Sequence, residues 1–92
     1  PIAPHNPMGP ISLAAGIQLG ASIPNYIVQE QVSLGEGYLK EPFKLQEDGS
    51  ILIPKKPGLG IELDEDALED KIGHDWNNPE SYDPRDGSVV DW

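Results

Sequence analysis

Two residues of this chain, His5 and Glu30, have side chains suited to moving a proton. His5 lies among three prolines and a glycine between Pro4 and Pro10. Proline fixes φ and disfavours helix at the residue before it, so the imidazole lies on a stiff, extended segment. An imidazole ring changes its charge near neutral pH. Glu30 is the first charged residue of the chain. A histidine and a carboxyl group that converge can form a proton-transfer pair.

We expect the two side chains to meet because each follows the carboxyl end of a predicted parallel strand. Ile2-Ala3 indicates the end of one buried strand, and Tyr26–Glu30 has the aromatic and β-branched content of the next. Between them, Pro10 to about Leu19 is apolar on every side, as in a buried helix, and Gly20 is expected to end it. The strands of such a unit are parallel and about 4.8 Å apart. Burial at this edge predicts a raised pKa for Glu30.

Simpler interpretations of both residues stay open on the residues alone. His5 could be a surface or packing residue of a proline-rich turn. Glu30 could be a structural carboxylate that binds backbone amides.

The second half of the chain is predicted to be rich in loops. Residues 31–42 indicate a loop, and the stretch Phe43 to Ile53 has the alternation and the Asp-Gly turn pair of a β-hairpin. Asp64 is placed to cap a short helix that Gly73 would end. The tail from residue 74 to 92 is turn-rich and is expected to lie on another surface.

Other motifs give weaker signals. Gly58-Leu59-Gly60 begins like a dinucleotide fingerprint, but it lacks the third glycine and the strand-to-helix setting, so it predicts a bend. His74-Asp75 is a minor candidate for a ligand pair. A cluster of carboxylates is expected to be a solvated helix face rather than a calcium loop, because the EF-hand spacing is absent; its members are Glu62, Asp64, Glu65, Asp66, Glu69 and Asp70.

The composition excludes several classes of protein. The net charge of −10 argues against nucleic acid and anionic membrane surfaces as partners. The chain has no cysteine, so it has no disulfide and no thiolate zinc site. Residues 1–29 contain no Asp, Glu, Lys or Arg, which is unusual for a solvated surface. The 92 residues are too few to enclose that segment, and we therefore expect a C-terminal fragment of a larger protein.

Four motifs resemble the C-terminal end of the D-galactonate dehydratase-like enzymes. These are acid-sugar dehydratases of the mandelate racemase branch of the enolase superfamily. The resemblance spans almost the whole chain and rests on Pro4-His5-Asn6-Pro7-Met8-Gly9-Pro10-Ile11-Ser12-Leu13-Ala14-Ala15, Gln29-Glu30-Gln31, Lys56-Pro57-Gly58-Leu59-Gly60-Ile61-Glu62 and Asp86-Gly87-Ser88-Val89-Val90-Asp91-Trp92.

The resemblance implies an α/β fold, in which the chain is the C-terminal fragment of a modified TIM barrel. Residues 1–34 would be the last strand-helix-strand (βαβ) unit of the barrel. Residues 35–92 would be a loop-rich C-terminal segment, with a β-hairpin and a short helix, that packs on the barrel and on a capping domain. The enzyme would be cytoplasmic and homo-oligomeric, and it would bind neither nucleic acid nor a membrane.

The resemblance also implies a reaction, the removal of water from a sugar acid to give a 2-keto-3-deoxy acid. Mg²⁺ would bind the substrate carboxylate, with its ligands upstream and none in this chain. His5 would be the general base that removes the α-proton, and Glu30 would hydrogen-bond the enediolate oxygen as an electrophile. The aspartate that pairs with the base in these enzymes would also lie upstream. Asn6 stands where these enzymes usually have cysteine, which leaves the sugar acid open.

Two other functions compete with this one. A racemase or another lyase of the same branch would share His5 and Glu30. A truncated, non-catalytic binding or structural piece would use neither residue for chemistry.

Overall fold

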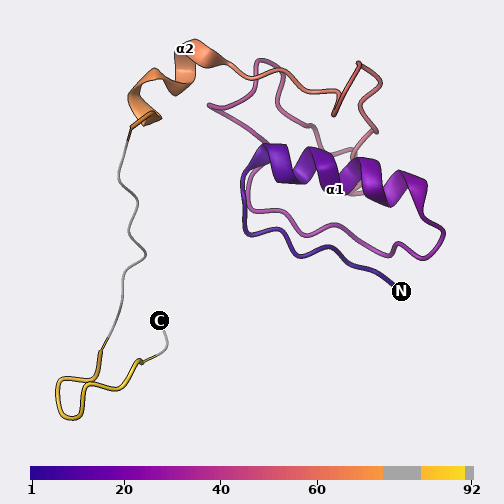
Figure 1. The fold of residues 1–92 in the computed structure, drawn as a ribbon. Helices are drawn as coiled ribbons and strands as arrows, with labels where there is room; N and C mark the ends of the chain where they lie inside the picture. The colour runs from indigo at the N-terminus through magenta and orange to yellow at the C-terminus, as the bar shows by residue number, and fades with distance from the viewer. Residues whose placement is uncertain (74–81, 91–92) are drawn as a thin grey trace.

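The computed structural model describes residues 1–73 and 82–90. It contains one long helix, α1 (Pro10–Ser22), one short helix, α2 (Glu65–Leu68), and one 3-10 turn, η1 (Glu69–Lys71). Figure 1 shows α1 in the middle of the N-terminal part, with connecting segments on both of its sides. No described helix is long and apolar enough to cross a membrane.

Helix α1 buries one face in this chain and leaves apolar side chains on another. Pro10 begins the helix at the position where its missing N–H costs nothing. Leu13 and Ala14 have no exposed surface, whereas Ile11 is 51% exposed. The buried face packs on the second half of the chain, and the exposed apolar face agrees with a helix that was predicted to be apolar all round.

The end of α1 lies later than the sequence predicted. Gly20 is inside the helix rather than at its end. A Cβ at this position would lie 2.7 Å from the Tyr26 ring, so the glycine permits close packing of the ring on the helix. The helix ends at Ser22 because Ile23 precedes Pro24 and adopts the extended conformation that a following proline favours.

The two predicted strands of the βαβ unit are reduced to one parallel bridge, between Ile2 and Tyr26. Ile2 N–H donates to Asn25 O at 2.7 Å, and Ile27 N–H donates to Ile2 O at 2.9 Å. In Figure 1 the indigo N-terminal segment and the segment that follows α1 run side by side along the helix. Neither 1–73 nor 82–90 contains a continuous strand. Two short paired segments are only marginally stable by themselves, so longer strands would require further strands beside them.

The predicted β-hairpin is confirmed in its turn, with one antiparallel bridge between Leu45 and Ile51. Gln46 N–H donates to Ser50 O at 2.8 Å and closes the loop. Gly49 has φ +80°, a value that glycine adopts without strain.

Residues 31–42 were predicted to be a loop, so a pairing that involves Leu39 was missed. Leu39 forms an antiparallel bridge with Leu63, and Lys40 N–H donates to Glu62 O at 3.0 Å. The predicted cap, Asp64, lies between this bridge and α2, and its side chain accepts a hydrogen bond from Ala67 N–H at the start of the helix. The predicted cap is therefore confirmed.

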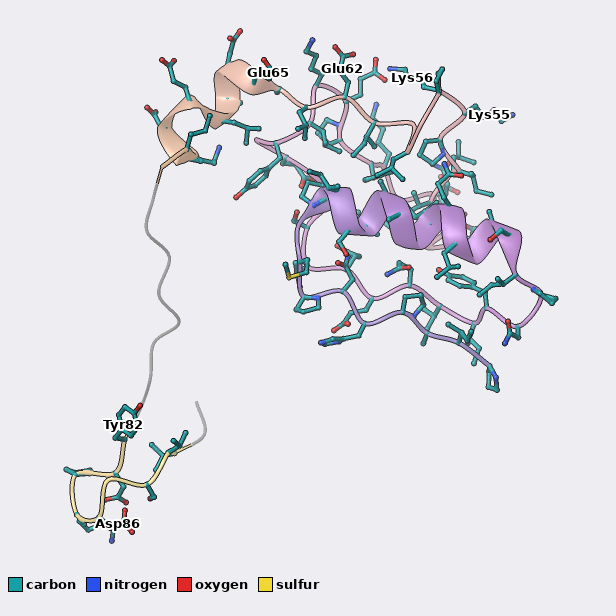
Figure 2. All side chains as sticks on the ribbon, viewed as in Figure 1. Lys55, Lys56, Glu62, Glu65, Tyr82 and Asp86 are labelled. Atoms are coloured by element: carbon teal, nitrogen blue, oxygen red, sulfur yellow. The ribbon has the colours of Figure 1, made fainter. Side chains whose placement is uncertain are left out.

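The core lies between α1 and the segments that follow residue 33. Its buried members are Leu13, Ala14, Ile17, Leu39 and Phe43, with Leu34, Ile51 and Ile61 packed against them. Figure 2 shows Lys55, Lys56 and Glu62 on the opposite side of α1 from the N-terminal segment.

Candidate functional site

The structure brings His5 and Glu30 into direct contact. His5 Nδ1 lies 2.7 Å from Glu30 Oε2. The main-chain N–H of Asn6 donates to the same oxygen at 2.6 Å. The meeting of the two side chains, which the sequence predicted, is therefore observed, while their roles in catalysis stay predictions.

The segment that precedes α1 in the chain and the segment that follows it position the pair. The bridge of Ile2 with Tyr26 aligns the two segments, so that His5 and Glu30 follow it at the same end of the pairing. The Gln29 side chain then links the segments, because its Nε2 donates to Glu30 O at 2.8 Å and to Pro4 O at 3.4 Å. The pair is thus supported by main-chain and side-chain contacts between the same two segments.

The predicted rise in the pKa of Glu30 is wrong. The hydrogen bond from Asn6 N–H lowers the pKa of this carboxyl below its ordinary value, and the hydrogen bond and charge of His5 lower it further. Desolvation opposes these effects, but the Glu30 side chain is 47% exposed, so burial is too slight to dominate. Glu30 is therefore ionised at neutral pH.

The pair is open to solvent on the side of the imidazole, since the His5 side chain is 79% exposed. An exposed ion pair adds little to stability. What the contact supplies is orientation of the ring, and the exposure leaves the ring accessible to a ligand.

Asn6 was missed as a member of this site. Only 2% of the residue is exposed, and its side-chain atoms Nδ2 and Oδ1 are buried without a hydrogen-bond partner. A buried polar group without a partner is costly and is uncommon in folded proteins. No signal in the sequence could have found it, because asparagine in a proline-rich turn is usually exposed.

The described part of the chain has no group of three or more His, Cys, Asp or Glu side chains that could hold a metal ion. Two carboxylates of the acidic cluster have other partners, since Glu62 forms an ion pair with Lys40 and Asp64 caps α2. The candidate ligand pair His74-Asp75 lies outside the described residues.

Gly58-Leu59-Gly60 forms a bend, as predicted, with Gly60 N–H donating to Pro57 O at 3.3 Å. Gln18 on α1 holds the start of this loop, because its Nε2 donates to Pro54 O at 3.1 Å. No helix begins directly at the end of this loop to receive a dinucleotide phosphate, since α2 starts only at Glu65.

A βαβ-type connection with a histidine–carboxylate pair at one end is the arrangement that the spacing of these residues predicted. The chain belongs to the enolase C-terminal domain-like family, whose sequence model matches residues 1–67. The predicted membership of the enolase superfamily is therefore confirmed.

Several curated relatives match almost the whole chain. The D-galactonate dehydratase of Xanthomonas oryzae pv. oryzae is 40% identical over 102 residues, which cover 98% of this chain and 26% of the relative. That of Xanthomonas campestris pv. campestris is also 40% identical over the same shares. That of Variovorax paradoxus is 37% identical over 103 residues. The chain thus spans about a quarter of the length of these relatives, 26% of the first. No solved structure matches the chain significantly.

Proposed function

We propose that this chain is the C-terminal part of a Mg²⁺-dependent acid-sugar dehydratase that converts a sugar acid to a 2-keto-3-deoxy acid. The observation that supports it is the contact of His5 with Glu30 in a chain of this family. The relatives that match along 98% of the chain are named D-galactonate dehydratase, so D-galactonate is the first substrate to test.

His5 is the general base in this proposal. Its Nδ1 faces Glu30, so Nε2 is the nitrogen left to take the proton from the α-carbon of the sugar acid. The electron pair of that C–H bond moves into the carboxylate and then forms the double bond as hydroxide leaves the β-carbon. The hydroxide departs as water with a proton from an acid outside this chain, and the resulting enol becomes the 2-keto acid.

Glu30 hydrogen-bonds the oxygen anion that forms on the substrate carboxylate. Because Glu30 of this chain is ionised at neutral pH, this donor role requires the carboxyl to be protonated in the full-length enzyme with substrate bound. The role predicts that Glu30→Gln keeps more activity than Glu30→Ala, because an amide still donates a hydrogen bond.

Mg²⁺ would supply positive charge to the substrate carboxylate. The described residues of this chain do not fit such a site, because they gather no set of three donor side chains and Glu30 Oε2 is taken by Asn6 and His5. We place the ligands outside this chain.

In the full-length enzyme, residues 1–34 form the last strand-helix-strand of a modified TIM barrel. Residues 35–92 pack on the barrel and on the capping domain. Two observations support this placement. The segments before and after α1 pair in parallel, and Ile27 and Val28 on the second segment are exposed in this chain. Parallel barrel strands are covered on both faces, so the rest of the barrel would cover these apolar side chains. We also propose a cytoplasmic homo-oligomer.

The test is turnover by the full-length gene product. The purified protein is incubated with D-galactonate and with other sugar acids, with Mg²⁺ or with EDTA, and 2-keto-3-deoxy acid is measured. We expect keto acid that depends on Mg²⁺. Epimerisation without loss of water would favour the racemase alternative, and no reaction with any sugar acid would favour the non-catalytic one.

A further inference from the structure

We propose that two adjoining grooves, formed by residues 40–66, are a two-fold interface between two copies of this protein. In this interface the basic groove of each copy receives the carboxylates of the other copy. The inference rests on the homo-oligomer of the proposed function and deepens it, because it names the surface through which the subunits meet. It does not depend on the reaction that the enzyme catalyses.

The first groove, called the basic groove, gathers most of the cations of an acidic chain. The chain has six Lys and Arg residues against 16 Asp and Glu residues. Four of the six line this groove, all of them exposed, and they are Lys40, Lys44, Lys55 and Lys56. Lys56 pairs with Glu41 at 3.0 Å, and Lys40 pairs with Glu62. Lys44 and Lys55 form no ion pair with the described residues, so the groove keeps a positive charge.

The second groove, called the acidic groove, adjoins the first and carries the opposite charge. Lys40 and Ile61 line both grooves. The carboxylates that line the acidic groove are Glu62, Asp64, Glu65 and Asp66. Glu65 and Asp66 are exposed and form no ion pair with the described residues. In Figure 2, Lys55, Lys56, Glu62 and Glu65 follow one another along the upper edge of the view.

The rest of the same protein is expected to cover the other side of this chain. Residues 1–29 contain no charged side chain, so a barrel can cover them without removing a charge from water. Lys55 and Lys56 lie on the opposite side of α1 from the N-terminal segment (Figure 2). Burial of a lysine without a partner is strongly unfavourable. Lys44 and Lys55 are therefore expected to face either water or an acidic surface.

A second copy is the partner that satisfies both grooves at once. In a two-fold interface, residue i of one copy meets residue j of the other, and j meets i. Because the grooves adjoin at Lys40, a two-fold axis between them sets the carboxylates of each copy opposite the lysines of the other. A foreign acidic partner would leave Glu65 and Asp66 without cations. Leu52 lines the basic groove with 70% of its surface exposed, so it adds apolar area to a contact whose register the charges fix.

The first experiment measures the mass of the full-length protein in solution by sedimentation, without substrate. We expect a dimer or a larger assembly whose association weakens with salt, since the screening length falls from about 10 Å at about 0.1 M salt to about 3 Å at about 1 M. The double variant Lys44→Glu, Lys55→Glu is expected to weaken association at least about 100-fold, because like charges then face each other across the interface. A monomeric wild type, or an assembly that the double variant leaves intact, overturns the inference.

The second experiment mixes two variants and so separates a lost contact from a misfolded protein. The double variant Glu65→Lys, Asp66→Lys reverses the acidic groove and is also expected to dissociate by itself. In the mixture, the two reversed grooves attract each other, and so do the two unaltered ones. We therefore expect the mixture to recover the mass of the wild type, which an unfolded variant could not do. Variants that have the circular dichroism of the wild type and stay apart in the mixture overturn the inference.

The double variant Glu36→Lys, Glu47→Lys is the matched control. It changes the net charge as much as the acidic-groove variant does, and both residues are exposed outside the lining of the two grooves. We expect it to keep the mass of the wild type. Dissociation of this control would show that net charge governs association, and it would overturn the inference.

Turnover assays of the same preparations keep the inference apart from the proposed function. An assembly that depends on the two grooves but forms no keto acid from any sugar acid supports the inference while the proposed dehydratase fails. An active enzyme whose mass none of these variants changes supports the dehydratase and overturns the inference.

Discussion

The main-chain N–H of Asn6 donates a 2.6 Å hydrogen bond to Glu30 Oε2 and so joins the segment before α1 to the segment after it. The contact holds the pKa of Glu30 below its ordinary value of 4.5. A carboxyl whose pKa is lower in the folded state stabilises the fold above the unfolded pKa, and this stabilisation is lost as the pH falls through the folded pKa. The contact is therefore complete at neutral pH and is released only in acid.

The first prediction follows from the lowered pKa of Glu30. In the full-length protein, the amide proton signal of Asn6 is expected to shift in acid with a midpoint below 4.5, the ordinary value for Glu30. The measurement is a pH titration by amide NMR, with Glu30→Gln as the control that removes the transition. A midpoint above 4.5 would show that burial in the complete protein outweighs the Asn6 hydrogen bond.

The second prediction concerns metal binding by the chain alone. We expect the isolated 92-residue chain to bind Mg²⁺ no better than a generic acidic peptide and to have no dehydratase activity. The part of the chain that the structure describes gathers no three donor side chains, and carboxylates such as Glu62 are paired with lysine. Calorimetric titration with Mg²⁺ measures it. A stoichiometric site of micromolar affinity would place ligands in this chain.

The third prediction is that the isolated chain is poorly folded. Its buried hydrophobic core in the described residues is small, while Ile27 and Val32 are each 63% exposed. Apolar surface of this kind is stable only when another part of a protein covers it. Near-ultraviolet circular dichroism through a thermal scan is the measurement. A cooperative transition with fixed aromatic signals would show an autonomous domain instead.

The sequence allowed the local features of the fold to be predicted where one residue type decides the conformation. Pro10 placed the start of α1, the Asp-Gly pair placed the hairpin turn, and Asp64 placed the cap of α2. The meeting of His5 with Glu30 followed from placing both residues at the same end of two parallel segments.

Features that depend on contacts between distant residues could not be predicted. Gly20 looked like a helix end, but its lack of a side chain serves the packing of Tyr26. The bridge of Leu39 with Leu63 joins two segments whose sequences do not show the alternation of a strand. The direction of the Glu30 pKa shift depends on one N–H, that of Asn6, whose position no sequence pattern gives.

The fourth prediction concerns the bend that follows Pro54. Gly60 has φ +78°, and a Cβ at this position would collide with the Pro54 side chain. Gly58 also has a positive φ, +68°, but a Cβ there would meet open space. Gly60→Ala in the full-length protein is therefore expected to cost about 1–3 kcal/mol more than Gly58→Ala, because only Gly60→Ala adds overpacking to backbone strain.

Chemical denaturation of the two glycine variants beside the wild type measures the difference. Gly58→Ala is the control for the backbone, since it changes φ preference without adding a contact. Equal losses in the two variants would show that Pro54 moves aside at no cost.

The last prediction concerns His5 in the full-length protein. His5→Asn keeps a polar side chain but removes the nitrogen that accepts the α-proton, so turnover is expected to fall by at least about 100-fold, the low end for general base catalysis. Stability and Mg²⁺ affinity are expected to change little, because the His5 side chain is 79% exposed and the proposed metal ligands lie elsewhere. Exchange of the substrate α-proton with deuterated solvent, if the wild type shows it, is expected to disappear in the variant. Turnover assays, thermal melts and Mg²⁺ titrations of the same preparations give the comparison. Near-normal turnover in His5→Asn would reduce His5 to a rigid turn residue, and the site proposed here would then be wrong even though the family assignment would stand.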